Sequence, residues 1–311
     1  MAETALPPLS YLHEAHVERQ LVWLTSYPKS GNTWTRVLVG NFLHELAEEG
    51  DEEQNERIAP VGTISSNRPN FDDAVGLASS DLMPREIDLL RPSAFRQIAK
   101  RSRQRMIFVK THDAFRRNAA GDDVFPADCT RGAILIVRHP MDVALSYAHH
   151  LGYRDCDRAV RAMGDTRHTM AGEGKRQTHQ LTMGWSGHYV SWTRQSAIPV
   201  LVVRYEDMLA DTATHFTRML RFLGIDGADD RERVERAVAL SRFDRLQEIE
   251  TREGFREIPV KAERFFRSGR SGEGIEALPE TLRQRILDEH GAVMAELGYS
   301  QHGADPLWPT P

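Results

Sequence analysis

Ten residues near the start of the chain, Thr25 to Trp34, constrain the fold more than any other stretch. They read TSYPKSGNTW and follow an apolar run, LVWL, while the residues after them, 35–50, have the spacing of an amphipathic helix. A strand, a tight turn and a helix predict a phosphate-binding turn, because the first N–H groups of a helix lack intrahelical partners. The usual turn of this kind has Lys after its last Gly, whereas here Lys29 precedes Gly31.

Apolar runs and helical patterns alternate along most of the chain. The runs typical of buried parallel strands are 21–27, 105–112, 132–140 and 198–208; helical patterns cover 32–48, 85–100, 141–150, 177–195 and 213–223, and two amphipathic stretches follow at 231–250 and 279–299. This alternation predicts one α/β domain over residues 1–311, with a central, mainly parallel sheet flanked by helices. Functional residues are expected at the carboxyl ends of the strands. The polar residues there are Ser26, Lys29, Lys110, His112, Arg138, Arg204 and Glu206.

The remaining segments are interpreted as loops or extensions. Residues 1–20 are expected to form an N-terminal extension, and 51–84, 154–176 and 251–278 to be loops. The glycine-containing segment 154–176 is a candidate for a mobile lid, with an ordinary surface loop as an equal alternative.

Charge and composition narrow the class of protein. A net charge of -5 argues against a general nucleic-acid binder, so any anion site is local. The two cysteines suggest no disulfide framework or metal site, and the N-terminus does not resemble a secretory signal. No run approaches the ~18 apolar residues of a membrane-spanning helix. We therefore expect a cytoplasmic protein.

Two further stretches carry candidate chemistry. Lys110 and His112, in VKTHDAF, are two residues apart, so an extended strand places both side chains on one face. A neighbouring lysine favours the neutral imidazole that a general base requires. Arg138 ends a strand, and Ser146 lies in the helix after it, so the two residues can hold one phosphate. His149 and His150 are expected to cap or decorate that helix.

Together these motifs resemble the cytosolic sulfotransferases, which transfer a sulfuryl group from 3′-phosphoadenosine 5′-phosphosulfate (PAPS). The family's Y-P-K-S-G-[TN]-T-W, K-T-H and R-x-P-x-D-V-x-x-S-Y motifs match Tyr27–Trp34, Lys110–His112 and Arg138–Tyr147, and its weaker Y-E-D-M and S-x-F motifs match Tyr205–Met208 and Ser241–Phe243. The matches follow the family's order along nearly the whole chain.

The resemblance implies a role for each matched residue. Lys29, Lys110 and His112 would be catalytic: Lys29 at the leaving oxygen, Lys110 at the sulfuryl oxygens, and His112 as the base that deprotonates an acceptor hydroxyl. The implied nucleotide-binding residues are Lys29, Ser30, Gly31, Asn32, Thr33, Trp34, Arg138, Ser146, Tyr205, Phe243, Arg267, Ser268 and Gly269. Arg138, Ser146 and Arg267 would hold the 3′-phosphate, and Trp34, Phe243 and Tyr205 the adenine. No metal is implied.

The late part of the chain departs from the family pattern. The expected R-K-G-x-x-G-D-W is replaced by FFRSGRSGEG at 265–274, in which Ser268 stands where Lys is expected and the Trp is missing. Arg270 is a candidate substitute. The short dimerisation signature of animal members is not visible, which leaves the oligomeric state open.

The motifs leave two other classes of protein possible, and they do not identify the acceptor. A P-loop kinase or NTPase would require Mg²⁺ and a Lys directly after the loop Gly, where this chain has Asn32. A non-catalytic nucleotide-binding relative is a third possibility. The acceptor, a small alcohol or phenol, would bind among 60–85, 113–125 and 154–180. These segments hold Phe71, Met83, Phe115, Phe125, Arg116, Arg117 and Arg154, either as pocket residues or as ordinary loop residues.

Overall fold

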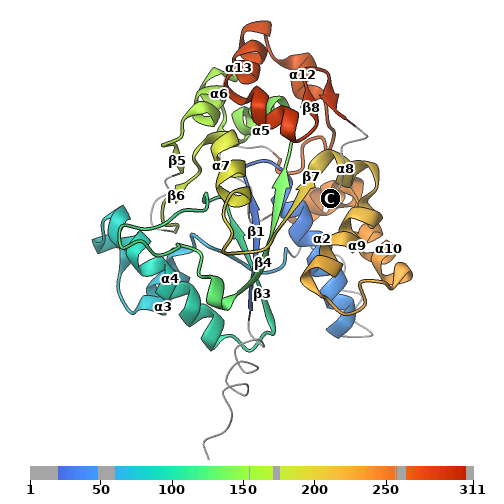
Figure 1. The fold of residues 1–311 in the computed structure, drawn as a ribbon. Coiled ribbons are helices and arrows are strands. Elements are labelled where there is room, and N and C mark those ends of the chain that lie inside the picture. The colour runs from blue at the N-terminus through green and yellow to red at the C-terminus, as the bar shows by residue number, and fades with distance from the viewer. Residues whose placement is uncertain are drawn as a thin grey trace, which may run out of the picture.

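In a computed structural model of the chain, a parallel sheet lies at the centre of the described residues (Figure 1). These are residues 20–47, 60–153, 155–170, 176–255, 257 and 264–305. The sheet has the order β2-β3-β1-β4-β7, formed by β2 (Thr63–Ile64), β3 (Met106–Thr111), β1 (Gln20–Ser26), β4 (Thr130–Val137) and β7 (Val200–Arg204). Every pairing is parallel. The predicted α/β fold with a parallel sheet is confirmed.

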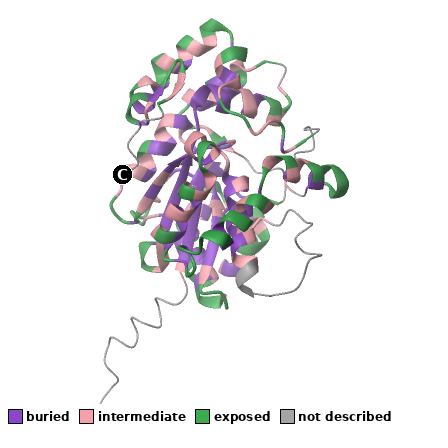
Figure 2. Ribbon diagram, turned by 90° about the vertical axis from the view of Figure 1, so that its right-hand side faces the viewer, coloured by how far each residue is buried: buried purple, intermediate pink, exposed green. Residues whose placement is uncertain are grey.

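Helices cover both faces of the sheet. On one face lie α4 (Pro84–Arg101), α5 (Pro140–Leu151), α6 (Asp157–Gly164), α7 (Gly184–Thr193) and α13 (Glu280–Glu296), and on the other α2 (Asn32–Ala47), α9 (Thr212–Leu223) and α10 (Arg231–Leu240). Alternate residues of β1 point to the two layers: Leu21 and Trp23 into the first, Val22 and Leu24 into the second. All four are fully buried, which explains the unbroken apolar run in the sequence. Figure 2 shows the strands at the centre of the fold in the colour of buried residues.

Shorter elements complete the fold. They are α3 (Arg68–Val75), α8 (Tyr205–Ala210), α11 (Phe243–Glu253), α12 (Glu273–Ala277), the 3-10 turns η2 (Ser79–Asp81) and η3 (Ala127–Cys129), and the antiparallel pairs β5 (Thr169–Met170) with β6 (Gln180–Leu181) and β8 (Tyr299–Ser300) with β9 (Gly303–Ala304). No helix within the described ranges has the length and apolar character needed to cross a bilayer.

The predicted loops contain regular structure, so those predictions are partly wrong. In 51–84, helix α3 begins after Asn67, whose side chain accepts a hydrogen bond from the N–H of Asn70, and ends at Gly76. The segment 154–176 contains α6, whose Ala159, Val160 and Met163 are buried. The other predicted loop, 251–278, includes the end of α11 and all of α12. Residues 171–175 lie outside the described residues, and the lid remains a prediction.

The predicted helix 177–195 is also wrong in its first half. Helix α7 starts only at Gly184, because the preceding residues are extended and pair with the segment after β3. Leu181 donates its N–H to Asp113 Oδ1 at 2.8 Å and accepts from the N–H of Ala114 at 2.8 Å. Met183, in the left-handed region with φ of 58°, makes the transition to the helix.

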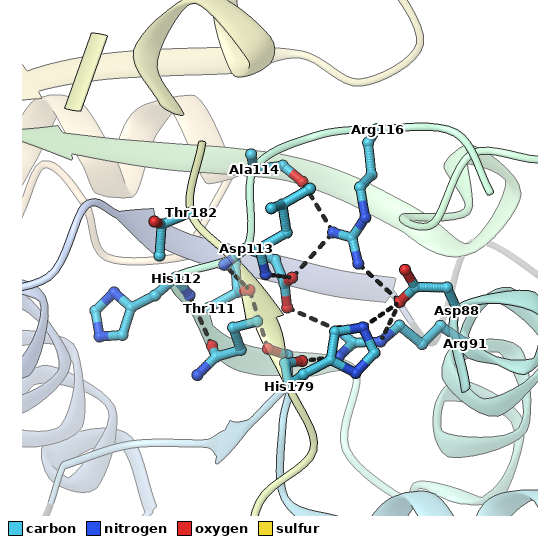
Figure 3. A network of polar contacts seen from close by, with 12 residues as sticks. Asp88, Arg91, Thr111, His112, Asp113, Ala114, Arg116, His179 and Thr182 are labelled. Carbon is cyan, nitrogen blue, oxygen red and sulfur yellow. Dashed lines mark hydrogen bonds and ion pairs between the residues drawn. The ribbon is translucent and has the colours of Figure 1, made fainter. Parts of the chain in front are cut away.

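A buried ion network ties β3 to α4 and to the extended residues before α7 (Figure 3). Asp113 directly follows His112 and accepts from Arg91 at 2.7 Å and from Arg116 at 2.9 Å. Asp88 forms ion pairs with both of those arginines, at 3.2 Å with Arg91 and 2.7 Å with Arg116. Burial opposes ionisation of Asp88, but hydrogen bonds and the arginines outweigh it and lower its pKa. In Figure 3 the His112 ring points away from this network.

We expect Arg91→Met to destabilise the fold by about 3–5 kcal/mol, because the substitution removes a cation from two carboxylates, one of them fully buried. Arg96→Met on the same helix is the matched control. Its ion pair with Asp128 is half exposed, with relative side-chain exposures of 48% and 60%, so its loss should cost less than about 1 kcal/mol. Urea unfolding measures both, and equal losses would contradict the structural role of the network.

Candidate functional site

The turn between β1 and α2 has an unusual backbone. Lys29 and Gly31 have φ of 70° and 103°, both in the left-handed region. A side chain at Gly31 would place its Cβ 2.7 Å from a ring carbon of Tyr205, so only glycine fits between the turn and α8. The two positive φ values turn the chain sharply into α2, and the helix N-terminus faces the turn.

Several polar atoms of this turn are buried without a protein partner. Ser30 Oγ and Asn32 Oδ1 have none among the described residues, and the Ser30 side chain is fully buried. The amide of Asn32 donates to Leu24 O at 2.8 Å, which fixes the side chain. Buried polar atoms are almost always hydrogen-bonded, so these two oxygens and the helix N-terminus are suited to a polar ligand.

His112 follows β3 and faces the same turn. Its Nδ1 lies 2.8 Å from the carbonyl oxygen of Ser26, which can only accept a hydrogen bond. Nδ1 therefore carries the proton, and Nε2 keeps the lone pair that a base requires. Burial, followed by the charge of Lys110, lowers the His112 pKa to about 3. The imidazole is thus neutral at neutral pH, as the sequence predicts, although burial is the larger cause.

Lys110 is bound to a carboxylate that the sequence analysis missed. Glu257 Oε2 lies 2.9 Å from Lys110 Nζ, and Oε1 lies 2.5 Å from the guanidinium of Arg36. Thr33 Oγ1 donates to the same carboxylate at 3.4 Å. Burial opposes ionisation of Glu257, but Lys110 and Arg36 outweigh it and lower the pKa to about 2. The Glu257 carboxylate thus already contacts Lys110 and Thr33, two residues that are predicted to bind a phosphosulfate.

Lys29 has a different environment. Its Nζ lies 3.4 Å from His150 Nδ1 and 4.7 Å from the centre of the Phe265 ring. Burial, then the nearby cations Lys110, Arg138 and Arg267, lowers the Lys29 pKa to about 7. The prediction that His150 only caps or decorates its helix is therefore wrong.

Arg138 brings the third motif to the turn. It donates to the carbonyl oxygens of Lys29, at 3.3 Å, and Arg270, at 2.8 Å, and its guanidinium lies 4.5 Å from the Tyr205 ring centre. Its Nε is buried and has no protein partner in the described parts of the chain. This donor is therefore free for a ligand.

The late segment 264–274 lies beside Arg138. Asp142 of α5 accepts from the N–H groups of Gly272 and Gly274, at 2.8 and 2.7 Å, and so fixes this segment to the helix. Arg267 and Ser268 both bind Glu273, and Gly269 contacts the Phe243 ring so closely that a Cβ would clash with it. The structure therefore brings the altered late motif to Arg138. The nucleotide-binding roles of Arg267 and Ser268 stay predictions.

The three predicted adenine-binding aromatic residues lie near one another. The rings of Trp34 and Tyr205 are 5.7 Å apart in an edge-to-face arrangement, and Trp34 Nε1 donates to Ser241 O at 2.9 Å. Trp34 and Phe243 pack on the same hydrophobic cluster with Phe266. Ser146, on α5, is partly exposed.

Some predicted candidates are not at this site. Arg204 is buried and binds Asp207, and Glu206 accepts from the N–H of His139 and from Tyr299, so these strand-end residues serve the fold. Phe71 and Phe125 are buried in hydrophobic clusters and are not exposed loop residues. Arg154 lies outside the described residues. The remaining acceptor candidates are the partly buried Phe115 and Arg116, which join the core and the ion network, and the exposed Met83 and Arg117.

Two comparisons identify what this arrangement is similar to. The sequence model of a family described as "Sulfotransferase domain" matches residues 19–298. Luciferin sulfotransferase from Photinus pyralis is 22% identical over 202 residues, which are 64% of this chain and 50% of that protein. The match thus spans half the length of that curated relative.

Solved structures share the fold. Retinol dehydratase in a complex with retinol and PAP superimposes with a TM-score of 0.59 at 20% identity, covering 92% of this chain and 86% of that chain. Mouse sulfotransferase SULT7A1 complexed with PAP superimposes with a TM-score of 0.56 at 19% identity, covering 92% of this chain and 87% of that chain.

We expect Glu257→Gln to strengthen binding of inorganic pyrophosphate by about tenfold or more, since one removed like charge is worth a few kcal/mol at short range. Lys110, Arg36 and Thr33 would then lose the carboxylate that they contact in the free protein. Calorimetric titration measures the affinity. Glu280→Gln, an exposed substitution on α13, is the control and should change nothing. Unchanged or weaker binding in Glu257→Gln would contradict competition between this carboxylate and a bound anion.

Proposed function

The chain belongs to the sulfotransferase domain family, and on that premise we propose that it transfers the sulfuryl group of PAPS to the hydroxyl group of a small alcohol or phenol. The products would be a sulfate ester and adenosine 3′,5′-bisphosphate. The observation that carries the proposal is the convergence of the Lys29 turn, His112 and Arg138 at one edge of the sheet. Three motifs far apart in sequence thereby meet.

The donor set fits a bisphosphorylated nucleotide. The turn supplies the α2 N-terminus, Lys29 and the unpartnered Ser30 Oγ, which suit a 5′-phosphosulfate. Arg138 supplies a free Nε that suits a separate 3′-phosphate, with Ser146 and Arg267 as its proposed partners. Asn32, Thr33, Gly31, Ser268 and Gly269 would complete the phosphate contacts, and Trp34, Tyr205 and Phe243 would contact the adenine.

PAPS would supply the sulfuryl group, and residues of this chain would accept the proton and stabilise the developing negative charge. His112 would accept the acceptor's proton at Nε2 as the acceptor oxygen forms its bond to sulfur. Lys29 would stabilise the negative charge that develops on the oxygen leaving with the 5′-phosphate, and Lys110 the charge on the sulfuryl oxygens. An anion beside Lys110 would also raise the His112 pKa, because nearby negative charge favours the imidazolium.

The acceptor class and the cellular compartment are part of the same proposal. The related retinol dehydratase structures contain retinol or androsterone, both small molecules with a hydroxyl group. We infer an acceptor of that class here. We place the reaction in the cytoplasm, where the free thiols of Cys129 and Cys156 would remain reduced.

We expect adenosine 3′,5′-bisphosphate to raise the melting temperature of the protein far more than ATP with Mg²⁺ does. Ligands that bind only the folded state stabilise it by mass action, and the proposed site holds a 3′-phosphate that ATP lacks. A thermal shift titration with both nucleotides makes the comparison. Equal or stronger stabilisation by ATP with Mg²⁺ would favour a kinase or NTPase and overturn the assignment.

We expect His112→Ala to lower turnover by about 10²–10⁴-fold while the bisphosphate still binds, because the substitution removes a base and leaves the phosphate contacts in place. The loss should be greatest for aliphatic alcohols and smaller for phenols, whose protons leave more easily. Turnover per folded molecule and bisphosphate affinity are measured on the same samples. If the variant keeps wild-type turnover on an aliphatic alcohol, another group accepts the proton.

A further inference from the structure

The ammonium group of Lys29 has neighbours unlike those of the other cations at the site. Lys110 has Glu257 at 2.9 Å, Arg138 has Asp142 at 3.8 Å, and Arg267 binds Glu273. Within the described residues, no carboxylate forms an ion pair with Lys29. Its Nζ lies 3.4 Å from His150 Nδ1 and 4.7 Å from the centre of the Phe265 ring, and neither group carries negative charge.

The contact with Lys29 bears on the tautomer and the protonation state of the His150 ring. When Lys29 is protonated, its ammonium group has only donors, so Nδ1 of His150 then accepts and Nε2 carries the ring proton. Burial, followed by the charges of Lys29 and Lys110, lowers the His150 pKa to about 3. The ring therefore stays neutral and remains a hydrogen-bond acceptor at neutral pH.

Helix α5 determines where this ring lies. The helix begins at Pro140, two residues after Arg138, and its residues Ser146 and His150 are four apart, so their side chains share one face. The same face therefore carries a proposed 3′-phosphate ligand and, one turn later, the partner of Lys29. The adjacent His149 is exposed, and no hydrogen bond joins it to Lys29 in the described part of the chain.

We propose that His150 is a positioning residue: its Nδ1 orients the Lys29 ammonium toward the oxygen that leaves with the 5′-phosphate. This inference rests on the proposed sulfuryl transfer. A neutral imidazole orients the ammonium without cancelling its charge. A carboxylate in that place would neutralise Lys29 and repel the anionic substrate.

The first test is kinetic and uses two near-isosteric variants. In His150→Asn the amide oxygen can take the place of Nδ1, whereas in His150→Gln it reaches the place of Nε2. We expect His150→Gln and His150→Phe to lower kcat by about tenfold to a hundredfold with smaller changes in KM, and His150→Asn to recover most of the loss. His149→Asn on the same helix should match the wild type. Equal kcat in all His150 variants would overturn the proposal.

The second readout is independent of turnover. The charges that face Lys29 are Lys110 of β3, Arg138 after β4, Arg267 of the late segment and Glu250 of α11. An anionic ligand prefers protonated Lys29, so affinity for adenosine 3′,5′-bisphosphate should fall as pH rises through the free-protein pKa of about 7. Loss of the imidazole acceptor destabilises the ammonium, so His150→Phe should move this midpoint to lower pH, and His150→Asn should restore it.

The two readouts separate the possible failures. If wild-type protein does not bind the bisphosphate, the proposed function is overturned, and this inference falls with it. If wild-type protein binds the bisphosphate but His150→Phe has the wild-type affinity profile with pH, only the role of His150 is overturned. Equal melting temperatures of the variants would exclude a loss of fold as the cause of lower kcat.

Discussion

The parallel register of β1, β3 and β4 is the constraint on which the whole site depends. Thr25 pairs with Thr111 and Ser26 with Ile136, so these strands end at one level. His112 therefore emerges beside Ser26, whose carbonyl oxygen selects the imidazole tautomer with a free Nε2. Asp113, the residue after His112, is held by ion pairs with Arg91 and Arg116 (Figure 3).

The site brings several cationic side chains together, and they differ in whether a carboxylate lies beside them. Lys110 and Arg36 share Glu257, whereas Lys29 contacts a neutral ring. Burial makes each unpaired charge costly, so the free protein uses internal carboxylates where it can. Among the described residues, Lys29 forms no ion pair with a carboxylate, and Lys29 is the cation proposed to meet the leaving oxygen, where negative charge develops during the reaction.

Local sequence patterns predicted the turn and the strand ends that form this site. Contacts between residues far apart in the sequence could not be predicted in this way. The turn at Lys29 and the strand ends at His112 and Arg138 were predictable because each lies next to a strong strand or helix pattern. Glu257 was not, since it reaches Lys110 across 147 residues and carries no motif. The position of His150 on the same helix face as Ser146 could have been predicted, because the two residues are four apart. The helix 177–195 was shortened because its first residues pair with Asp113 and Ala114.

The most direct test of sulfuryl transfer follows the group itself. PAPS labelled with a heavy sulfur isotope is incubated with the protein and a panel of phenols and small alcohols, and all products are identified by mass spectrometry. The account predicts that the label appears in a sulfate ester of at least one acceptor, with one equivalent of adenosine 3′,5′-bisphosphate formed. Release of the label only as inorganic sulfate, or no consumption of PAPS with any acceptor, would contradict it.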